Sequence, residues 1–250
     1  MNLRARTLLF LFSAVGLALA LALGIRDLPP LGDYRGPYGK LVVQVAVYER
    51  HATDIVNAIN YDYRAFDTLG EEFIFFAAVL GVLLLFRPTG DDKKGKSTAK
   101  VEDALPVSDT LRVSMQAMVA TMVVFGVYMA THGQLTPGGG FQGGVILASA
   151  PLLVYLSGDA GAFERIVSSP LVKLAESGGA AGYAMIGIAA LFFGAHFLTN
   201  IIPFGATGDL FSSGTIAVIS VCVGIEIAGG FVVLMQSYLK EIIEERIHNE

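Results

Sequence analysis

Residues 131–150 read THGQLTPGGGFQGGVILASA, and this stretch sets the arrangement of the helices on either side of it. Five glycines and one proline fall between Pro137 and Gly144. Because proline removes a backbone donor and glycine is the poorest helix former after proline, we expect no helix to continue through this run. Apolar segments flank it at residues 113–130 and 143–156, so the break falls at or near a membrane boundary. The sequence predicts a connection between two transmembrane helices, and the number of glycines indicates close packing against another backbone.

The composition is that of an integral membrane protein. The chain has 250 residues, of which 54% are hydrophobic and 16% charged, and its mean hydropathy is +0.61. Charged residues make up about a quarter of an ordinary soluble domain. The net charge of -5 argues against a nucleic-acid partner, and the single cysteine, Cys222, excludes an intramolecular disulfide. The sequence contains no metal-ligand spacing and no catalytic grouping. We therefore expect that the chain binds no cofactor and no resident metal and is not an enzyme.

Six apolar segments approach the length of about 20 helical residues that crosses a bilayer. They are residues 7–25, 73–86, 113–130, 143–156, 179–198 and 214–238. The second is short, so its helix must begin near Asp67 or Leu69. The sequence therefore predicts an all-α polytopic membrane protein with six transmembrane helices. For the first segment a cleaved signal peptide is the alternative, since Arg4 and Arg6 precede the apolar core, but its length favours a retained helix.

Two polar connections interrupt these segments. Within residues 26–68, residues 42–47 are compatible with a strand or an interfacial helix, and residues 54–59 with a helical turn capped by Thr53 or Asp54. The second connection, residues 87–112, contains the charged run DDKKGKSTAKVED. It is the best candidate for a module boundary. We therefore expect a two-helix module at residues 1–88, a charged cytoplasmic linker at 89–107 and a four-helix domain at 108–250.

Basic residues gather on one side of the six-span order. The two short loops on the other side, residues 131–142 and 199–213, contain no Lys or Arg. The positive-inside rule then places both termini in the cytoplasm and the glycine run outside. The long first loop is an exception with five basic residues, which its six acids offset.

Glu226 lies near the middle of the last span, where an acidic side chain costs roughly 2.5 to 3.5 kcal/mol on insertion scales. Its helical neighbours at i−4, i+3 and i+4 are Cys222, Gly229 and Gly230. These small residues permit close helix contact and favour an inward-facing Glu226. The alternative to an ion-path role is a protonated glutamate that is hydrogen-bonded within the bundle.

Other ionisable groups stand near the ends of the spans. Glu71 and Glu72 fall in the first turns of the second span, where they either complement the helix dipole or place at least Glu71 on an ion route. His132 ends the third span and His196 lies near the end of the fifth; each is either a proton relay or a hydrogen-bond partner between helices. Asp209 precedes the last helix and is expected to cap it.

Two signatures resemble a known family. Residues 131–150, quoted above, and residues 208–234, GDLFSSGTIAVISVCVGIEIAGGFVVL, resemble the B subunit of Mrp-type multisubunit cation/proton antiporters. They lie in the family's order and cover most of residues 108–238. Residues 54–86, DIVNAINYDYRAFDTLGEEFIFFAAVLGVLLLF, resemble the carboxy-terminal segment of the large A subunit. In related membrane-bound hydrogenases the corresponding segment is a separate small subunit.

The resemblance implies a four-span core and a place beside large antiporter subunits in a prokaryotic cell membrane, with Na⁺ and H⁺ as the transported ions. The family positions carried over by motif are Asp67 and Glu71 in FDTLGEE, His132 in THGQ and Glu226 in GIEIAGG. The ion-path candidates are then Glu226, Glu71, Asp67, His132, His196 and Glu72. The implied structural loop consists of Pro137, Gly138, Gly139, Gly140, Gly143 and Gly144.

Three functions remain compatible with these features. The first is a subunit of a sodium/proton antiporter that contributes to the ion path and docks the large subunits. The second is a membrane-arm subunit of a redox-driven ion pump of the hydrogenase type. The third is a purely structural assembly subunit.

Overall fold

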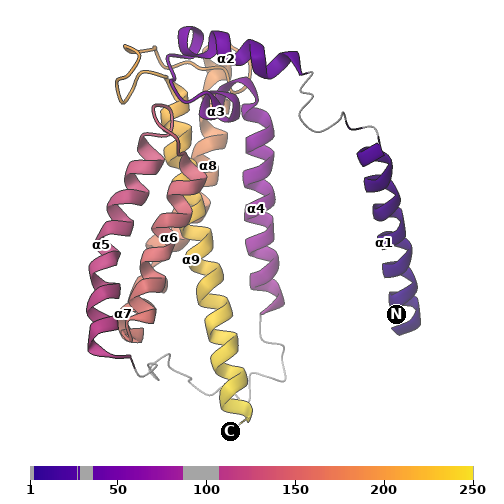
Figure 1. Cartoon of the computed structure of the whole chain (residues 1–250), viewed down its shortest axis with the longest axis vertical. Coiled ribbons are helices and arrows are strands. Elements are labelled where there is room, and N and C mark those ends of the chain that lie inside the picture. Colours follow the sequence, from indigo (N-terminus) through magenta and orange to yellow (C-terminus); the bar gives the residue numbers. More distant parts are fainter. Residues whose placement is uncertain (1–2, 27, 29–35, 87–106, 250) are drawn as a thin grey trace. The chain divides into compact units, whose positions relative to one another are not determined.

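The computed structural model describes residues 3–26, 28, 36–86 and 107–249. The ordered elements among these residues are all helical, as the sequence predicts. The chain divides into two compact units, Met1–Leu41 and Val42–Glu250. The first contains α1 (Leu3–Arg26) and the start of α2 (Pro37–Arg50), and the other elements belong to the second (Figure 1). Of the predicted linker at 89–107, only Val107 lies within the described residues.

In the first unit, α1 is a single helix that covers the whole apolar segment expected at residues 7–25. Its described side chains are exposed within the unit, among them Leu8, Phe12 and Leu23. An apolar helix with this much exposed surface requires lipid or another protein around it. Its retention in the mature protein stays a prediction.

In the first polar connection, where the sequence left strand and helix open, the structure has short helical elements. Residues 42–47 lie in α2, so the helix rather than the strand is correct. The helical turn expected at residues 54–59 is α3 (Ile55–Ala58), and its cap is Asp54, whose Oδ1 accepts hydrogen bonds from the N–H groups of Val56 at 2.8 Å and Asn57 at 3.3 Å. A π-helical turn, η1 (Ile59–Tyr63), follows directly.

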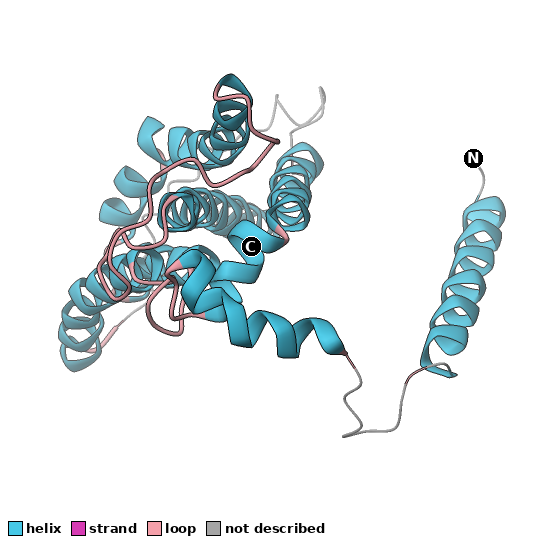
Figure 2. Cartoon of the chain, turned by 90° about the horizontal axis from the view of Figure 1, so that it is seen from above, coloured by secondary structure: helices cyan, strands magenta, loops and turns pink. Residues whose placement is uncertain are grey.

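Five long helices of the second unit pack into a bundle around α9 (Figures 1 and 2). They are α4 (Ala65–Leu85), α5 (Asp109–Thr131), α6 (Gly140–Leu156), α8 (Pro170–Phe192) and α9 (Thr215–Asn249), with the short α7 (Ala160–Val167) after α6. The most apolar segment of α9 is 67% buried, against 22% for α4, 11% for α5 and 33% for α8. The outer helices therefore direct most of their apolar surface away from the bundle.

Four of the described helices are long and apolar enough to cross a bilayer: α4, α5, α8 and residues Thr215–Ile242 of α9. The described apolar segments Phe10–Arg26 of α1 and Gly140–Leu156 of α6 are shorter. The protein is thus a multi-pass helical membrane protein. The predicted count of six crossings includes these two shorter segments.

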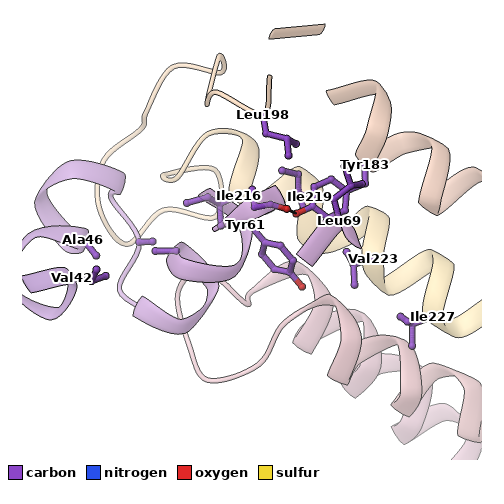
Figure 3. Packing of buried hydrophobic residues seen from close by; sticks show 13 residues of the cluster. Val42, Ala46, Tyr61, Leu69, Tyr183, Leu198, Ile216, Ile219, Val223 and Ile227 are labelled. Carbon is purple, nitrogen blue, oxygen red and sulfur yellow. Dashed lines mark hydrogen bonds between the residues drawn. The ribbon is translucent and has the colours of Figure 1, made fainter. Parts of the chain in front are cut away.

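The loop end of the bundle, where α4, α6 and α9 begin and α5 and α8 end, has its own apolar core. Its buried members include Val42, Ala46, Tyr61, Leu69, Tyr183, Leu198, Ile216, Ile219, Val223 and Ile227 (Figure 3). These residues come from α2, η1, α4, α8 and α9 and from the loop after α8. The core therefore fixes residues 42–63 against the helix ends.

The glycine run is half loop and half helix, because α6 already begins at Gly140. A Cβ atom on Gly140 would collide with the Ser220 carbonyl oxygen of α9, and one on Gly143 would lie 2.7 Å from the Gly126 carbonyl oxygen of α5. The predicted close packing against another backbone is confirmed. No helix continues through the run, as expected, because α5 ends at Thr131. The next helix begins three residues before the predicted Gly143, since contact with two neighbouring helices offsets the poor helix propensity of glycine.

The fifth predicted span is displaced. The hydropathy pattern predicts it at residues 179–198, whereas α8 runs over Pro170–Phe192. Ser169 caps it by accepting a hydrogen bond from the Leu171 N–H at 3.2 Å, and Pro170 occupies the first turn. Hydropathy misses this start because Lys173 and Glu176 interrupt the apolar pattern. His196 consequently lies in the loop after the helix and not within it.

The cap expected for the last helix is also different. Asp209 lies in a turn before α9 and is exposed. The first N–H of α9, at Thr215, donates instead to the side-chain oxygen of Asn200 at 2.9 Å. The capping group therefore comes from a residue 15 positions earlier in the chain, which a local pattern does not reveal.

Candidate functional site

Three glutamates from three different helices lie inside the bundle. Glu72 of α4 is 4% exposed, Glu176 of α8 is 6% exposed and Glu226 of α9 is fully buried. Both carboxylate oxygens of Glu226, and one oxygen of each of the others, have no hydrogen-bond partner among the described residues. Glu226 lies on α9, which packs against both α4 and α8. We name these three residues the carboxylate line.

Reciprocal glycine contacts position two members of the carboxylate line. A Cβ on Gly179 of α8 would lie 2.5 Å from the Glu226 nitrogen, and a Cβ on Gly229 of α9 would lie 2.6 Å from the Glu176 nitrogen. The backbone of Glu226 therefore lies against Gly179, three residues after Glu176. The backbone of Glu176 lies against Gly229, three residues after Glu226. Only glycine fits at these crossings, so the antiparallel pair α8–α9 places both glutamates along one helix contact.

The three carboxylates lie at different depths below the loop end. With a rise of about 1.5 Å per residue, Glu72 is ~10 Å from the start of α4 and Glu226 is ~16 Å from the start of α9. Glu176 is ~24 Å from the end of α8 by the same measure. Since the hydrocarbon core of a bilayer is about 30 Å thick, the carboxylate line extends over roughly half of that thickness, about 14 Å.

The other acidic candidates lie outside the line. Glu71 is exposed, and its neighbour Glu72 is the residue of this pair that faces the bundle. Asp67 is 49% exposed in its side chain and pairs with Arg64, with 2.5 Å between Arg64 Nη2 and Asp67 Oδ2. The helical phase of α4 decides this difference, because residues 71 and 72 point about 100° apart.

The two candidate histidines lie at the loop end. His132 follows the last residue of α5, where its ring stacks on Tyr128 with centroids 4.4 Å apart and its Nδ1 lies 3.1 Å from Thr131 Oγ1. His196 lies in the loop after α8. Neither histidine has a contact with the carboxylate line among the described residues. Their roles in an ion path remain predictions from the sequence.

Sequence reasoning missed Glu176, because the predicted fifth span begins three residues after it. A signal was present nonetheless. Glu176 has Gly179 and Ala180 at i+3 and i+4, the same kind of arrangement that Glu226 has with Gly229 and Gly230. An acid followed by small residues on the same helical face identifies both positions.

The glycine run docks onto the segment around α3. The Asn57 amide donates to the Gly138 carbonyl at 3.0 Å, and the Asp54 N–H donates to the Gln134 carbonyl at 3.0 Å. The Tyr61 hydroxyl meets the backbone at Gly140, and burial raises the pKa of Tyr61 above its ordinary value. The loop that carries Pro137 is thus a docking surface for α3 and η1 within this chain.

The sequence matches known antiporter proteins. Residues 110–233, about half of the chain, match the family described as "Domain related to MnhB subunit of Na+/H+ antiporter". A Rhizobium meliloti (strain 1021) protein, named as the probable A/B subunit of a K⁺/H⁺ antiporter, is 31% identical over 173 residues, which cover 62% of this chain and 17% of that protein. This chain therefore spans a small part of that relative.

Two solved structures share the fold. A chain of the membrane-bound sulfane sulfur reductase (MBS), an archaeal respiratory membrane complex, superposes with a TM-score of 0.68 at 30% identity, over 94% of this chain and 98% of that chain. A chain of the Mrp complex from Dietzia sp. DQ12-45-1b superposes with a TM-score of 0.67 at 24% identity, over 95% of this chain and 26% of that chain. The chain belongs to the MnhB-related family of Na⁺/H⁺ antiporter subunits, which are multi-pass membrane transporter subunits.

Proposed function

We propose that this chain is a six-span subunit of a multisubunit cation/proton antiporter and that its carboxylate line forms part of the route for Na⁺ or H⁺. The observation that carries the proposal is the burial of Glu72, Glu176 and Glu226 on successive levels of the bundle, with carboxylate oxygens that have no hydrogen-bond partner among the described residues. An ionised carboxylate without a partner is costly in such surroundings. A proton or a desolvated cation removes that cost, so each position is suited to take one up and release it.

Oxygen ligands suit a hard monovalent cation, and the same carboxylates carry protons when they are neutral. A single carboxylate provides too few ligands for a stable cation site. The carboxylate line therefore works as a set of stepping positions and relies on the large subunits for the complete path. The close approach of α8 and α9 beside Glu176 and Glu226 supports transfer between these two members.

The module division and the orientation belong to the same proposal. Residues 1–88 derive from an A-subunit-like segment and residues 108–250 from the B subunit, joined through the linker at 89–107. The name of the Rhizobium meliloti relative, which joins A and B, supports this division. The absence of Lys and Arg from the two short loops supports cytoplasmic termini and an external glycine run.

The test is proton exchange in everted membrane vesicles that contain the whole complex, at several sodium concentrations. We expect Glu226→Gln, Glu176→Gln and Glu72→Gln to slow exchange by about a hundredfold, the size typical of a positioned proton-transfer group. Glu71→Gln is the matched control, since it changes the neighbouring glutamate on the exposed face of α4. Native gels must show that every variant assembles.

Unchanged exchange in all three variants of the line, with assembly intact, would sink the proposal and leave a purely structural assembly subunit. In that case Gly139→Leu, at a backbone φ of 141°, should abolish co-purification of partners while the glutamate variants stay silent.

A second candidate function is supported by the coverage of the sulfane sulfur reductase chain, which this chain matches nearly from end to end. Here the same carboxylate line would belong to a membrane arm driven by a redox module. Purification of the native complex distinguishes the two. Iron–sulfur absorbance that co-elutes with this chain supports the redox-driven arm, and partners that are all antiporter subunits support the antiporter.

A further inference from the structure

A cavity of about 500 Å³ opens at the loop end, between the start of α4 and the loop that follows α8. Its wall includes Asp62 of the π-helical turn, Ala65 and Asp67 of α4, and Thr199 and Asn200 of the loop. Turns of the π type are frequent at functional sites, because they break the regular hydrogen-bond ladder. Ala65 in the cavity wall and Glu72 of the carboxylate line belong to the same helix, seven residues apart.

The charges on the wall are balanced. Arg50 Nε lies 2.5 Å from Asp62 Oδ1, and the Asn200 amide donates to the other oxygen of Asp62 at 3.2 Å. Asp67 pairs with Arg64 in the same way. Two arginines and two aspartates give a wall that is polar but has no net charge. Such a wall holds water without trapping an ion of either sign.

One hydroxyl links the cavity to the interior. Tyr183 of α8 is fully buried, and its hydroxyl donates to the Ala65 carbonyl at 2.8 Å (Figure 3). Ala65 is also part of the cavity wall. Glu72 follows Ala65 on α4, two turns deeper in the bundle. From the cavity inward, the order is therefore Ala65, with the Tyr183 hydroxyl bound to its carbonyl, and then Glu72.

We propose that this cavity is the water-filled entrance for protons at the loop end and that Tyr183 relays them to Glu72. The inference rests on the proposed function, because it requires Glu72 to be a working group. A proton rather than sodium fits the geometry, since Tyr183 is fully buried and a hydrated cation needs an opening. A hydroxyl passes a proton by rotation alone.

The relay conserves every atom. A hydronium ion in the cavity gives a proton, through one water that enters beside Ala65, to the Tyr183 oxygen, while the hydroxyl passes its own proton, through a second water, to a carboxylate oxygen of Glu72. Rotation of the hydroxyl back to the Ala65 carbonyl restores the starting arrangement. Tyr183 gains and loses one proton in each cycle and is unchanged.

Tyr183→Phe tests the relay, because it removes the hydroxyl and keeps the ring. Proton exchange by the assembled complex should fall about tenfold, less than for a direct acid–base group, because a water can take part of the vacated space. The apparent sodium affinity should stay unchanged. Tyr155→Phe is the matched control, because the Tyr155 ring packs on Phe163 in a separate apolar cluster, with ring centroids 5.3 Å apart.

Two results would overturn the inference. If Tyr183→Phe lowers the amount of assembled complex but exchanges normally per complex, the hydroxyl only anchors α8 to α4. If Glu72→Gln stops exchange while Tyr183→Phe assembles and exchanges at the wild-type rate, the relay fails and the proposed function survives. If Glu72→Gln exchanges protons at the wild-type rate, in contrast, the proposed function itself fails.

A second measurement tests the cavity directly. Thr199→Cys places a thiol on its wall, and a bulky membrane-impermeant thiosulfonate reagent is added to each side of the membrane in turn. Exchange should be lost after labelling from one side only. Thr207→Cys, an exposed position in the same loop but outside the cavity wall, and the wild-type chain with Cys222 are the controls. Equal loss in Thr207→Cys, or no loss in Thr199→Cys from either side, would contradict the proposal.

Discussion

Among the described residues, acidic side chains are paired at the loop end and have unpaired oxygens in the interior of the bundle. At the loop end, Asp62 and Asp67 each pair with an arginine. In the interior, Glu72, Glu176 and Glu226 are almost completely covered, and they have carboxylate oxygens without partners in the described part of the chain. A paired acid contributes to the fold, whereas an unpaired buried acid opposes it. Under the proposed function, the unpaired acids serve the ion route and the paired acids serve the structure.

The largest expected effect compares the two groups in one assay. Asp67→Asn should change proton exchange by less than about fivefold, since an exposed ion pair is worth at most ~1 kcal/mol. Glu226→Gln should cost about a hundredfold in the same vesicles. Equal losses in the two variants would remove the distinction between paired and unpaired acids.

A large effect on assembly is expected from the crossing that positions Glu226. Gly179→Ala places a methyl group 2.5 Å from the Cys222 carbonyl oxygen and should destabilise the fold by about 1–3 kcal/mol, as overpacking does. Gly178→Ala has open space and should be neutral or slightly stabilising. The amount of folded protein after graded heating of detergent-solubilised complex measures both. Similar behaviour of the two variants would contradict the close approach.

A moderate effect is expected at the loop end. Asn200→Ala removes the acceptor for the first N–H of α9 and the amide that reaches Asp62, so we expect a loss of about 1–2 kcal/mol. Asp209→Ala should have no measurable effect, because Asp209 does not cap α9. Thermal unfolding of the two variants measures both losses. A larger loss of stability in Asp209→Ala than in Asn200→Ala would show that Asp209 caps α9, as expected from the sequence.

The smallest effect is a dependence on alkaline pH. Burial, followed by the hydrogen bond that Tyr63 donates to Glu49 at 2.8 Å, raises the pKa of Tyr63 to about 12. A raised tyrosine pKa favours the neutral folded form, so its stabilisation is complete below pH 10.0, the ordinary value, and is lost as the pH rises through about 12. Compared with Tyr63→Phe, the wild-type chain should lose its advantage in this window. A constant difference in melting temperature across the window would argue against the bond.

Much of the fold was readable from the sequence, because hydropathy and helix caps are local. The apolar segments, the helical turn of α3 and the choice of its cap between Thr53 and Asp54 follow from neighbouring residues, and the structure selects Asp54. The start of α8 was misplaced, although Ser169 and Pro170 are typical of a helix start, because Lys173 and Glu176 broke the apolar pattern. The error removed Glu176 from the predicted site.

The site was only partly readable, because burial depends on neighbours that are distant in the chain. Glu226 was found, since an uncharged stretch surrounds it on both sides. The choice between Glu71 and Glu72 needed the phase of α4 in the bundle. The Tyr183 hydroxyl has a partner 118 positions away, at Ala65, and no pattern within either helix predicts that pairing.

By itself, the sequence determined that this chain is a helical membrane protein, where its apolar segments lie and which family it resembles, because these properties depend on composition and on short motifs. Only the tertiary structure decided which acids are covered, which glycines permit helix contact and where a cavity opens. Those properties arise when separate helices meet, and the free energy of an ionisable group is set by the atoms that surround it in space.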